Sequence, residues 1–308
     1  MVFERTPAPC DVLRLPGAGV DLAASRHGAP TAPVEVLFAH GFGQTRRAWQ
    51  SSAAALAGHG RASLAYDARG HGESARNPAD LRYTGHQFTD DLIVVAGELP
   101  QPPVLVAASM GGLFGLLAEA RWPGLFRAMV LVDITPRWEA AGLERILAFM
   151  TAFPGGFASL ADAADAIAGY LPGRARRNDA ALREVLRQQP DGRWHWHWDR
   201  RLVDELARDA QRHQDDLAVA ARAVSCPLLL VSGGRSDLVS PRTVDDFLAL
   251  APHARHVRLA DATHMLAGEE NDRFTATLLE YLGELDGEGD TGRRAAPRLP
   301  ASVNGATP

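Results

Sequence analysis

One serine in this sequence stands where its hydroxyl could act as a nucleophile. Residues 103–108 form an apolar run rich in β-branched side chains, and after Ser109 the chain continues with the small residues of a helix. The pattern predicts a strand, a sharp turn and a helix, with Ser109 at the tip. Such a turn strains the backbone at its centre and needs small neighbours, which Ala107 and Gly111 provide. We therefore expect the hydroxyl to be held clear of the backbone.

The helix that follows Ser109 should add to this chemistry. It is expected to begin at about Met110, so its unpaired amides and its dipole would face an anion that forms beside Ser109. Strand, serine turn and helix together make a nucleophile elbow, which resembles that of the α/β-hydrolase superfamily. Ala107 replaces the first glycine of the Gly-x-Ser-x-Gly pattern.

A second segment strengthens the resemblance. Residues 34–39 are typical of a buried strand, and they run into His40-Gly-Phe-Gly43 before a predicted helix. This segment resembles the oxyanion loop of the superfamily. There, the amide after the His-Gly pair, here that of Phe42, joins the amide after the nucleophile, here that of Met110. The resemblance implies that these two backbone N–H groups hold the oxyanion.

The stretch Asp67-Ala-Arg-Gly-His-Gly-Glu-Ser74 follows the next predicted strand, residues 62–66. It is similar to the Asp-x-Arg-Gly-His-Gly turn of many α/β-hydrolases, whose role there is largely structural. A glycine-rich turn with buried Arg and Asp side chains is enough to explain it. We therefore interpret His71 as a loop histidine rather than a catalytic one.

The resemblance also implies the rest of a catalytic triad. Asp237 lies between a buried strand and a helix that should begin with Ser240 as its N-cap and Pro241 as its first residue, and this is the superfamily's position for the acid. His264 follows the last strand, at the position of the triad histidine. Asp133 also follows a strand and is the alternative acid. We favour Asp237, because Asp133 begins a turn that resembles a structural feature of the superfamily.

Strands that alternate with helices predict an α/β protein with a mostly parallel, doubly wound sheet. We assign residues 1–134 and 218–285 to an α/β-hydrolase core. Residues 135–217 lack strand patterns and are rich in Ala and Arg, so they are predicted to form an inserted helical cap over the site. Residues 286–308 contain no aromatic residue and are expected to form a disordered tail.

The predicted cap carries aromatic residues that could line an apolar substrate pocket. If residues 194–198 are extended, three tryptophans share one face, and His195 and His197 share the other. A third metal ligand at a recognisable spacing is missing, so no metal site is predicted. Cap core and substrate pocket both remain open for these tryptophans. The pocket candidates are Trp138, Phe153, Trp194, Trp196 and Trp198.

Composition narrows the possible functions. The net charge of −5 does not give the basic surface that nucleic-acid binding requires. All 32 basic residues are arginine, which excludes catalysis by a lysine side chain. The only two cysteines, Cys10 and Cys226, lie far apart in the sequence, which is consistent with a protein of a reducing compartment. The N-terminus lacks the apolar core of a signal peptide, and no apolar run is long enough to span a membrane. We therefore expect a cytoplasmic protein.

These observations lead to one expected function with two alternatives. We expect a serine hydrolase that cleaves an ester or related acyl bond of a small, largely apolar substrate through an acyl-serine, without metal or organic cofactor. The first alternative is a carbon-carbon hydrolase or acyltransferase that uses the same triad. The second is a ligand receptor of this fold whose hydrolysis is incidental. The expected partner is a small acyl substrate, and the oligomeric state is left open.

Overall fold

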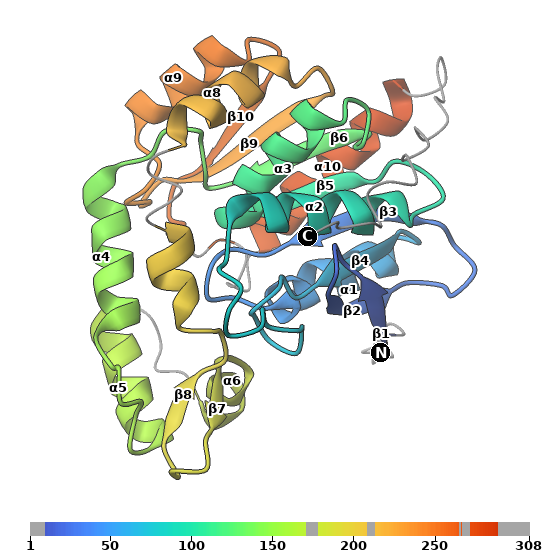
Figure 1. Ribbon diagram of the computed structural model, residues 1–308. Helices are drawn as coiled ribbons and strands as arrows, with labels where there is room; N and C mark the ends of the chain where they lie inside the picture. The colour runs from blue at the N-terminus through green and yellow to red at the C-terminus, as the bar shows by residue number, and fades with distance from the viewer. Residues whose placement is uncertain (1–9, 171–177, 208–212, 265, 267–271, 289–308) are drawn as a thin grey trace, which may run out of the picture.

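An eight-stranded sheet runs through the centre of the structure, with the strand order β1-β2-β4-β3-β5-β6-β9-β10 (Figure 1). The structure is a computed structural model that describes residues 10–170, 178–207, 213–264, 266 and 272–288. The first three strands in this order pair antiparallel, and the remaining neighbours pair parallel. The strands are β1 (Cys10–Pro16), β2 (Asp21–His27), β3 (Val34–Ala39), β4 (Ala62–Tyr66), β5 (Val104–Ala108), β6 (Ala128–Val132), β9 (Leu228–Gly233) and β10 (Arg255–Leu259).

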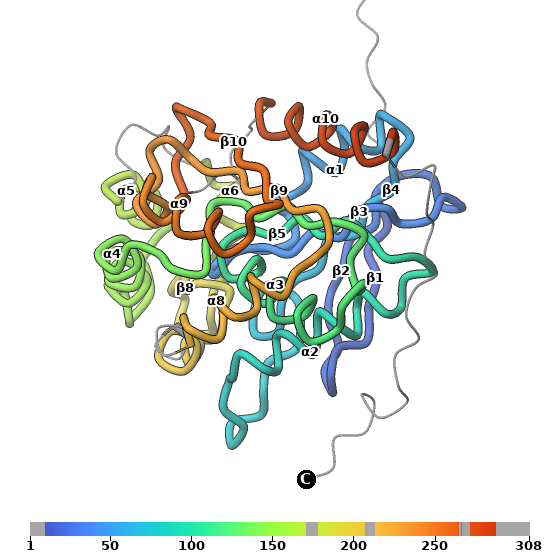
Figure 2. The backbone as a smooth tube through the Cα atoms, turned by 90° about the horizontal axis from the view of Figure 1, so that it is seen from above, coloured from blue at the N-terminus to red at the C-terminus, as the bar shows by residue number. Residues whose placement is uncertain are grey.

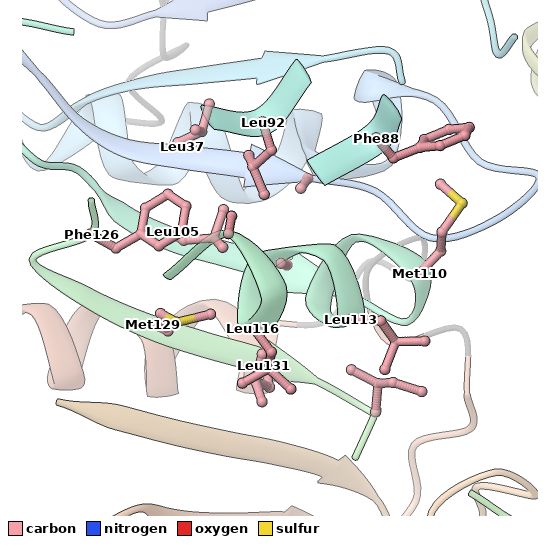
Figure 3. Close-up of a cluster of buried hydrophobic side chains, with 14 of the residues drawn as sticks. Leu37, Phe88, Leu92, Leu105, Met110, Leu113, Leu116, Phe126, Met129 and Leu131 are labelled. Atoms are coloured by element: carbon pink, nitrogen blue, oxygen red, sulfur yellow. The ribbon is translucent and has the colours of Figure 1, made fainter. Parts of the chain in front are cut away.

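Helices cover both faces of this sheet, because its central strands bury side chains on both sides. In β5, Leu105 packs into the cluster under α2 (Gly85–Gly97) and α3 (Met110–Arg121), while Val104 and Val106 pack into the opposite cluster. Figure 3 shows Leu105 with the side chains from α2, α3 and the neighbouring strands. Figure 2 shows α1 (Gln50–Gly58) and α10 (Asp272–Glu288) on the other side of the sheet. Two further helices, α8 (Gln214–Ala223) and α9 (Pro241–Leu250), extend the α3 layer, and a short 3₁₀ turn, η1 (Arg46–Trp49), precedes α1.

The predicted doubly wound α/β core is confirmed, and most of its elements lie where the sequence patterns indicate. Ser240 caps α9 by accepting a hydrogen bond from the Thr243 amide at 3.3 Å, and Pro241 is the first helical residue, as expected. The helix α10 continues to Glu288, so the first residues of the predicted tail are helical, and 289–308 lie outside the described residues. No helix in the described ranges is long and apolar enough to cross a membrane.

The segment between β6 and α8 stands apart from the sheet (Figure 1). Most of its described residues are helical, as predicted, but it also holds a small antiparallel hairpin that the sequence patterns did not indicate. We call this segment the cap, and the division of the chain at residues 134 and 217 stays a prediction. Its elements are α4 (Ala140–Thr151), α5 (Leu160–Tyr170), α6 (Asp179–Val185), β7 (Leu186–Gln188), β8 (Trp194–Trp196) and a π-helical turn, η2 (Val203–Ala207).

Candidate active site

Ser109 occupies the sharp turn between β5 and α3, in the strained conformation expected of a nucleophile elbow. Its φ of 46° and ψ of −119° lie in a backbone region that residues other than glycine rarely adopt. The crowding around this turn explains why its neighbours are small. A Cβ at Gly111 would lie 2.8 Å from the carbonyl oxygen of Ala39, and Ala107 is fully buried in β5. The sequence-based prediction of strand, turn and helix is confirmed.

In the loop after β10, His264 is hydrogen-bonded to the carboxylate of Asp133, with 2.7 Å between Nδ1 and Oδ2. Asp133 directly follows β6, is completely buried, and has a φ of 51°. Its carboxylate also accepts hydrogen bonds from the Gly233 amide at 2.7 Å and from the Ser236 hydroxyl at 2.5 Å. These donors hold the carboxylate in place, so it can fix the orientation of the His264 ring.

This geometry corrects the assignment of Asp237 as the partner of His264. The Asp237 carboxylate forms an ion pair with Arg145 of α4 instead. The loop after β9 explains this placement of Asp237. There, the Ser236 hydroxyl turns inward and donates to Asp133, and it also accepts hydrogen bonds from the amides of residues 238 and 239. Asp237 therefore faces the cap. There, Gly142 packs so closely that any side chain would overlap the Asp237 carbonyl oxygen.

The loop after β3 lies close to Ser109, as expected from the sequence. A Cβ at Gly41 would lie only 3.2 Å from the Cβ of Ser109. The Gly41 amide donates to the Gln44 side chain at 3.0 Å and the Gly43 amide donates to His71 Nε2 at 3.3 Å, whereas no described residue accepts from the amide of Phe42. Met110 is the first residue of α3, so its amide has no helical partner. Both predicted oxyanion donors thus have N–H groups available.

The Asp67–Ser74 turn supports this loop through buried polar contacts. Asp67 pairs with Arg46, and Arg69 makes two 2.6 Å contacts with Asp91, so the buried arginine and aspartate of the turn bind partners outside it. His71 is fully buried and does not line the cavity described below. Burial lowers the pKa of its ring well below the ordinary value, and the neighbouring His40 and His197 lower it further. His71 is therefore neutral.

A cavity of about 1670 Å³ lies between the core and the cap, and Ser109, Met110, Phe42 and His264 line it together. Its wall includes five rings in succession, each in contact with the next. The distances between ring centroids are 6.0 Å for Phe42–Trp198, 4.8 Å for Trp198–Trp196, 5.8 Å for Trp196–Phe149 and 4.1 Å for Phe149–Tyr170. The cavity is thus apolar along one side, with Ser109 in its lining.

The structure divides the aromatic pocket candidates. Trp138, Trp196 and Trp198 line the cavity, whereas Phe153 and Trp194 do not and pack against the apolar cluster inside the cap. Within the tryptophan run, Trp194 thus packs in the cap, and Trp196 and Trp198 border the cavity, where contact with a substrate stays a prediction. Phe149 and Tyr170, which also line the cavity, were missed. Their helices, α4 and α5, are amphipathic, but the sequence does not indicate which of their apolar residues face the cavity and which pack inside the cap.

A sequence profile of the alpha/beta hydrolase family matches residues 36–277. The chain is 26% identical over 259 residues to the 3-hydroxybutyrate-oligomer hydrolase of Cupriavidus necator, which covers 79% of this chain and 86% of that protein. It is 29% identical over 276 residues to an esterase of Mycobacterium tuberculosis, covering 86% of both proteins.

Solved structures show the same similarity. The crystal structure of an E-2-(acetamidomethylene)succinate hydrolase superposes with a TM-score of 0.75 at 23% identity, over 89% of this chain and all of that one, which supports the fold. The crystal structure of an esterase from Mycobacterium tuberculosis superposes with a TM-score of 0.68 at 26% identity, over 90% of this chain and 92% of that one.

Proposed function

Because the chain belongs to the alpha/beta hydrolase family, we propose that it is a serine hydrolase that cleaves a carboxylic ester or related acyl bond of a largely apolar substrate. The observation that carries the proposal is the pairing of His264 with a buried Asp133 at a cavity that Ser109 also lines. In this proposal Ser109 is the nucleophile, His264 the general base and Asp133 the acid of the triad.

The first half of the reaction forms an acyl-serine. With Nδ1–H donated to Asp133, the Nε2 atom of His264 is left to take the proton of Ser109 as Oγ attacks the acyl carbon. The carbonyl π pair moves onto oxygen. When the tetrahedral intermediate collapses, the bond to the leaving alcohol breaks, and His264 returns its proton to that oxygen.

The second half releases the acid. Water attacks the acyl-serine while His264 Nε2 takes one of its protons, and collapse of the second intermediate breaks the bond to Ser109 Oγ, which recovers the proton. In both halves the amides of Phe42 and Met110 would donate hydrogen bonds to the oxyanion. In comparable sites the loss of one such donor costs about 3 kcal/mol of transition-state stabilisation.

The cavity supports an apolar substrate. The row of rings from Phe42 to Tyr170 offers flat apolar surface, which favours the burial of an aryl or long alkyl group. At about 1670 Å³, the cavity exceeds the range of roughly 300–1,000 Å³ that is usual for small-molecule sites. The substrate can therefore be more extended than the small ester expected from the sequence. The relatives named as an esterase and as a hydrolase of 3-hydroxybutyrate oligomers support ester cleavage.

Covalent labelling tests this proposal directly. We expect a fluorophosphonate to modify Ser109 and to abolish turnover of short nitrophenyl esters, and we expect Ser109→Ala to fold but to lose both labelling and turnover. Ser51→Ala is the matched control, because Ser51 lines the same cavity from α1 but has no histidine partner in the proposal. Mass spectrometry of the adduct and initial-rate measurements provide the readouts.

Two outcomes would contradict the proposal. Labelling at Ser51 or another serine would move the nucleophile away from the elbow. Specific binding of an apolar ester with no turnover by the wild-type protein would favour a receptor.

A further inference from the structure

A histidine of the cap reaches into the loop that presents the oxyanion donor. His197 follows strand β8 and is 1% exposed, although it comes from a segment inserted far from this loop in sequence. Its Nε2 lies 3.1 Å from the carbonyl oxygen of Gly43, and its Nδ1 lies 2.8 Å from the amide nitrogen of Gly72. The His197 ring thus joins the cap to two loops of the core.

The contacts of His197 define its protonation. The Gly72 amide can only donate, so Nδ1 must accept, and the ring proton therefore sits on Nε2 and is donated to Gly43. Burial lowers the pKa of His197 to about 3, and the nearby His40, Arg187 and Arg76 also lower it, while the Gly43 carbonyl raises it. His197 is consequently neutral and in one tautomer at neutral pH.

Three histidines hold three consecutive peptide groups of the oxyanion loop. His40 Nδ1 donates to the Gly41 carbonyl at 2.8 Å, His71 Nε2 accepts from the Gly43 amide, and His197 donates to the Gly43 carbonyl. His40 and His71 belong to the core. His197 is the member of this set that the cap supplies.

The contact with His197 is connected to the oxyanion donor through two peptide planes. The peptide whose carbonyl belongs to Gly43 carries the Gln44 amide, and this amide donates to the Gly41 carbonyl at 3.1 Å. The peptide that contains the Gly41 carbonyl carries the Phe42 amide. A rotation of the first peptide would therefore disturb the second and turn the Phe42 N–H.

The backbone at Gly43 has conformational freedom that the hydrogen bond from His197 to the Gly43 carbonyl, which we call the clamp, would restrict. Gly43 has a φ of +73°, and the cap packs directly on it, because a Cβ at this residue would lie 2.5 Å from Met150 and 3.2 Å from Trp198. Glycine loses more backbone freedom on folding than other residues, so contacts that hold it are needed to keep one conformation.

We propose that His197 is a positioning residue that aligns the Phe42 amide of the oxyanion hole through the Gly43 carbonyl, so that the cap completes the catalytic loop as well as covering the substrate. This inference rests on the proposed serine hydrolase function. It assigns His197 no contact with substrate. The defect expected from its loss is in kcat rather than in KM.

A pair of conservative variants separates the two contacts of the ring. In His197→Gln the amide nitrogen can occupy the place of Nε2 and donate to Gly43, whereas the shorter side chain introduced by His197→Asn reaches only as far as Nδ1 and can accept from Gly72. We expect His197→Asn to lower kcat for a short nitrophenyl ester by about tenfold or more with KM changed less than about threefold. His197→Gln should retain most of the wild-type kcat.

The matched control is His195→Ala. His195 is the other cap histidine of this run, and its ring contacts Asp191 at 3.3 Å instead of the oxyanion loop. This variant should keep the wild-type kcat. Thermal melting of all variants identifies any loss that comes from unfolding.

Amide hydrogen exchange of residues 41–44 measures the same effect without turnover. Exchange of the Gly43 and Gln44 amides should be faster in His197→Asn than in His197→Gln. Equal kcat in the two variants, or equal exchange at these amides, would overturn the positioning role. If instead the wild-type protein hydrolyses no ester while the two exchange patterns differ as expected, the proposed function fails and the clamp on the loop stands.

Discussion

His264 Nδ1 lies 2.7 Å from Asp133 Oδ2, and the two residues follow strands β10 and β6, which are separated in the sheet by β9. The Gly233 amide at the end of β9 and the Ser236 hydroxyl in the loop that follows both donate to this carboxylate and hold it in place. Asp237, the acidic residue of the loop after β9, lies at the interface with the cap, where it forms an ion pair with Arg145. One loop thus supports the acid of the neighbouring strand.

Asp133→Asn should abolish most turnover. The asparagine oxygen would accept from Gly233, which leaves its NH₂ group to face His264, and the ring would then have to accept at Nδ1 and carry its proton on Nε2. In that tautomer His264 cannot take the proton of Ser109. We expect kcat to fall by roughly 10⁴ while the protein still folds, as judged by circular dichroism.

Asp237→Asn is the matched control for this change. Its side chain is about one quarter exposed and its partner Arg145 is more than half exposed, so the ion pair should contribute no more than about 1 kcal/mol to stability. We expect turnover to change less than about threefold. A loss of about 10⁴ in Asp237→Asn, with activity retained in Asp133→Asn, would return the acid to Asp237.

The aromatic wall predicts a change in substrate preference for Trp196→Ala. Trp196 lines the cavity between Trp198 and Phe149, so its removal shortens the apolar surface available to a long acyl or aryl group. We expect the ratio of kcat/KM for an octanoate over an acetate ester to fall about tenfold, which corresponds to roughly 1.4 kcal/mol.

Trp194→Ala removes the same side chain two residues away and serves as the comparison. Trp194 packs in the cap core under the guanidinium of Arg183, 4.8 Å from the ring centroid, and does not line the cavity. It should lower the melting temperature without changing the ratio of the two esters. Similar ratios in both variants would show that Trp196 also acts only through cap stability.

The sequence predicts the core of this fold well and the site in part. Strand and helix patterns, the elbow at Ser109 and the capped start of α9 are local features, and the structure confirms them. The partner of His264 depends on which side chain of a loop turns inward, and this is decided by contacts with Asp133 that are distant in sequence. The clamp by His197 depends likewise on how the cap packs against Gly43.

Two glycines in helices should respond oppositely to replacement by alanine. A Cβ at Gly111 would lie 2.8 and 2.9 Å from the carbonyl oxygens of Ala39 and His40, which are backbone atoms and cannot move aside easily. Gly283 in α10 has nothing within 4 Å of the same position. We expect Gly111→Ala to destabilise the protein by about 1–3 kcal/mol. Gly283→Ala should stabilise it by about 0.5–1 kcal/mol in urea denaturation. The same sign for both changes would contradict the close packing behind the elbow.

The buried histidines predict that the protein loses stability in weak acid. Burial lowers the pKa values of His40, His71 and His197 in the folded state, whereas an unfolded histidine titrates near 6.5. Below about pH 6.5 the unfolded chain therefore binds more protons than the folded one, and the free energy of unfolding falls as the pH falls. Above that pH the three histidines are neutral in both the folded and the unfolded state, so they do not change the free energy of unfolding with pH. The pKa values of Asp91 and Glu119 are raised by burial, which acts in the opposite direction at lower pH.

His197→Gln isolates the part of this effect that comes from one ring. With a folded pKa of about 3, His197 takes up no proton in the folded state at pH 5, so ionisation of the unfolded chain costs about 2 kcal/mol relative to neutral pH. The free energy of unfolding should therefore drop by about 2 kcal/mol less in His197→Gln than in the wild type between pH 7.5 and pH 5. Urea denaturation of both proteins at the two pH values measures this difference, in which the contributions of groups that do not interact with His197 cancel. Equal drops would mean that the His197 ring becomes protonated in the folded state, and that the Nδ1 contact with Gly72 is lost at pH 5.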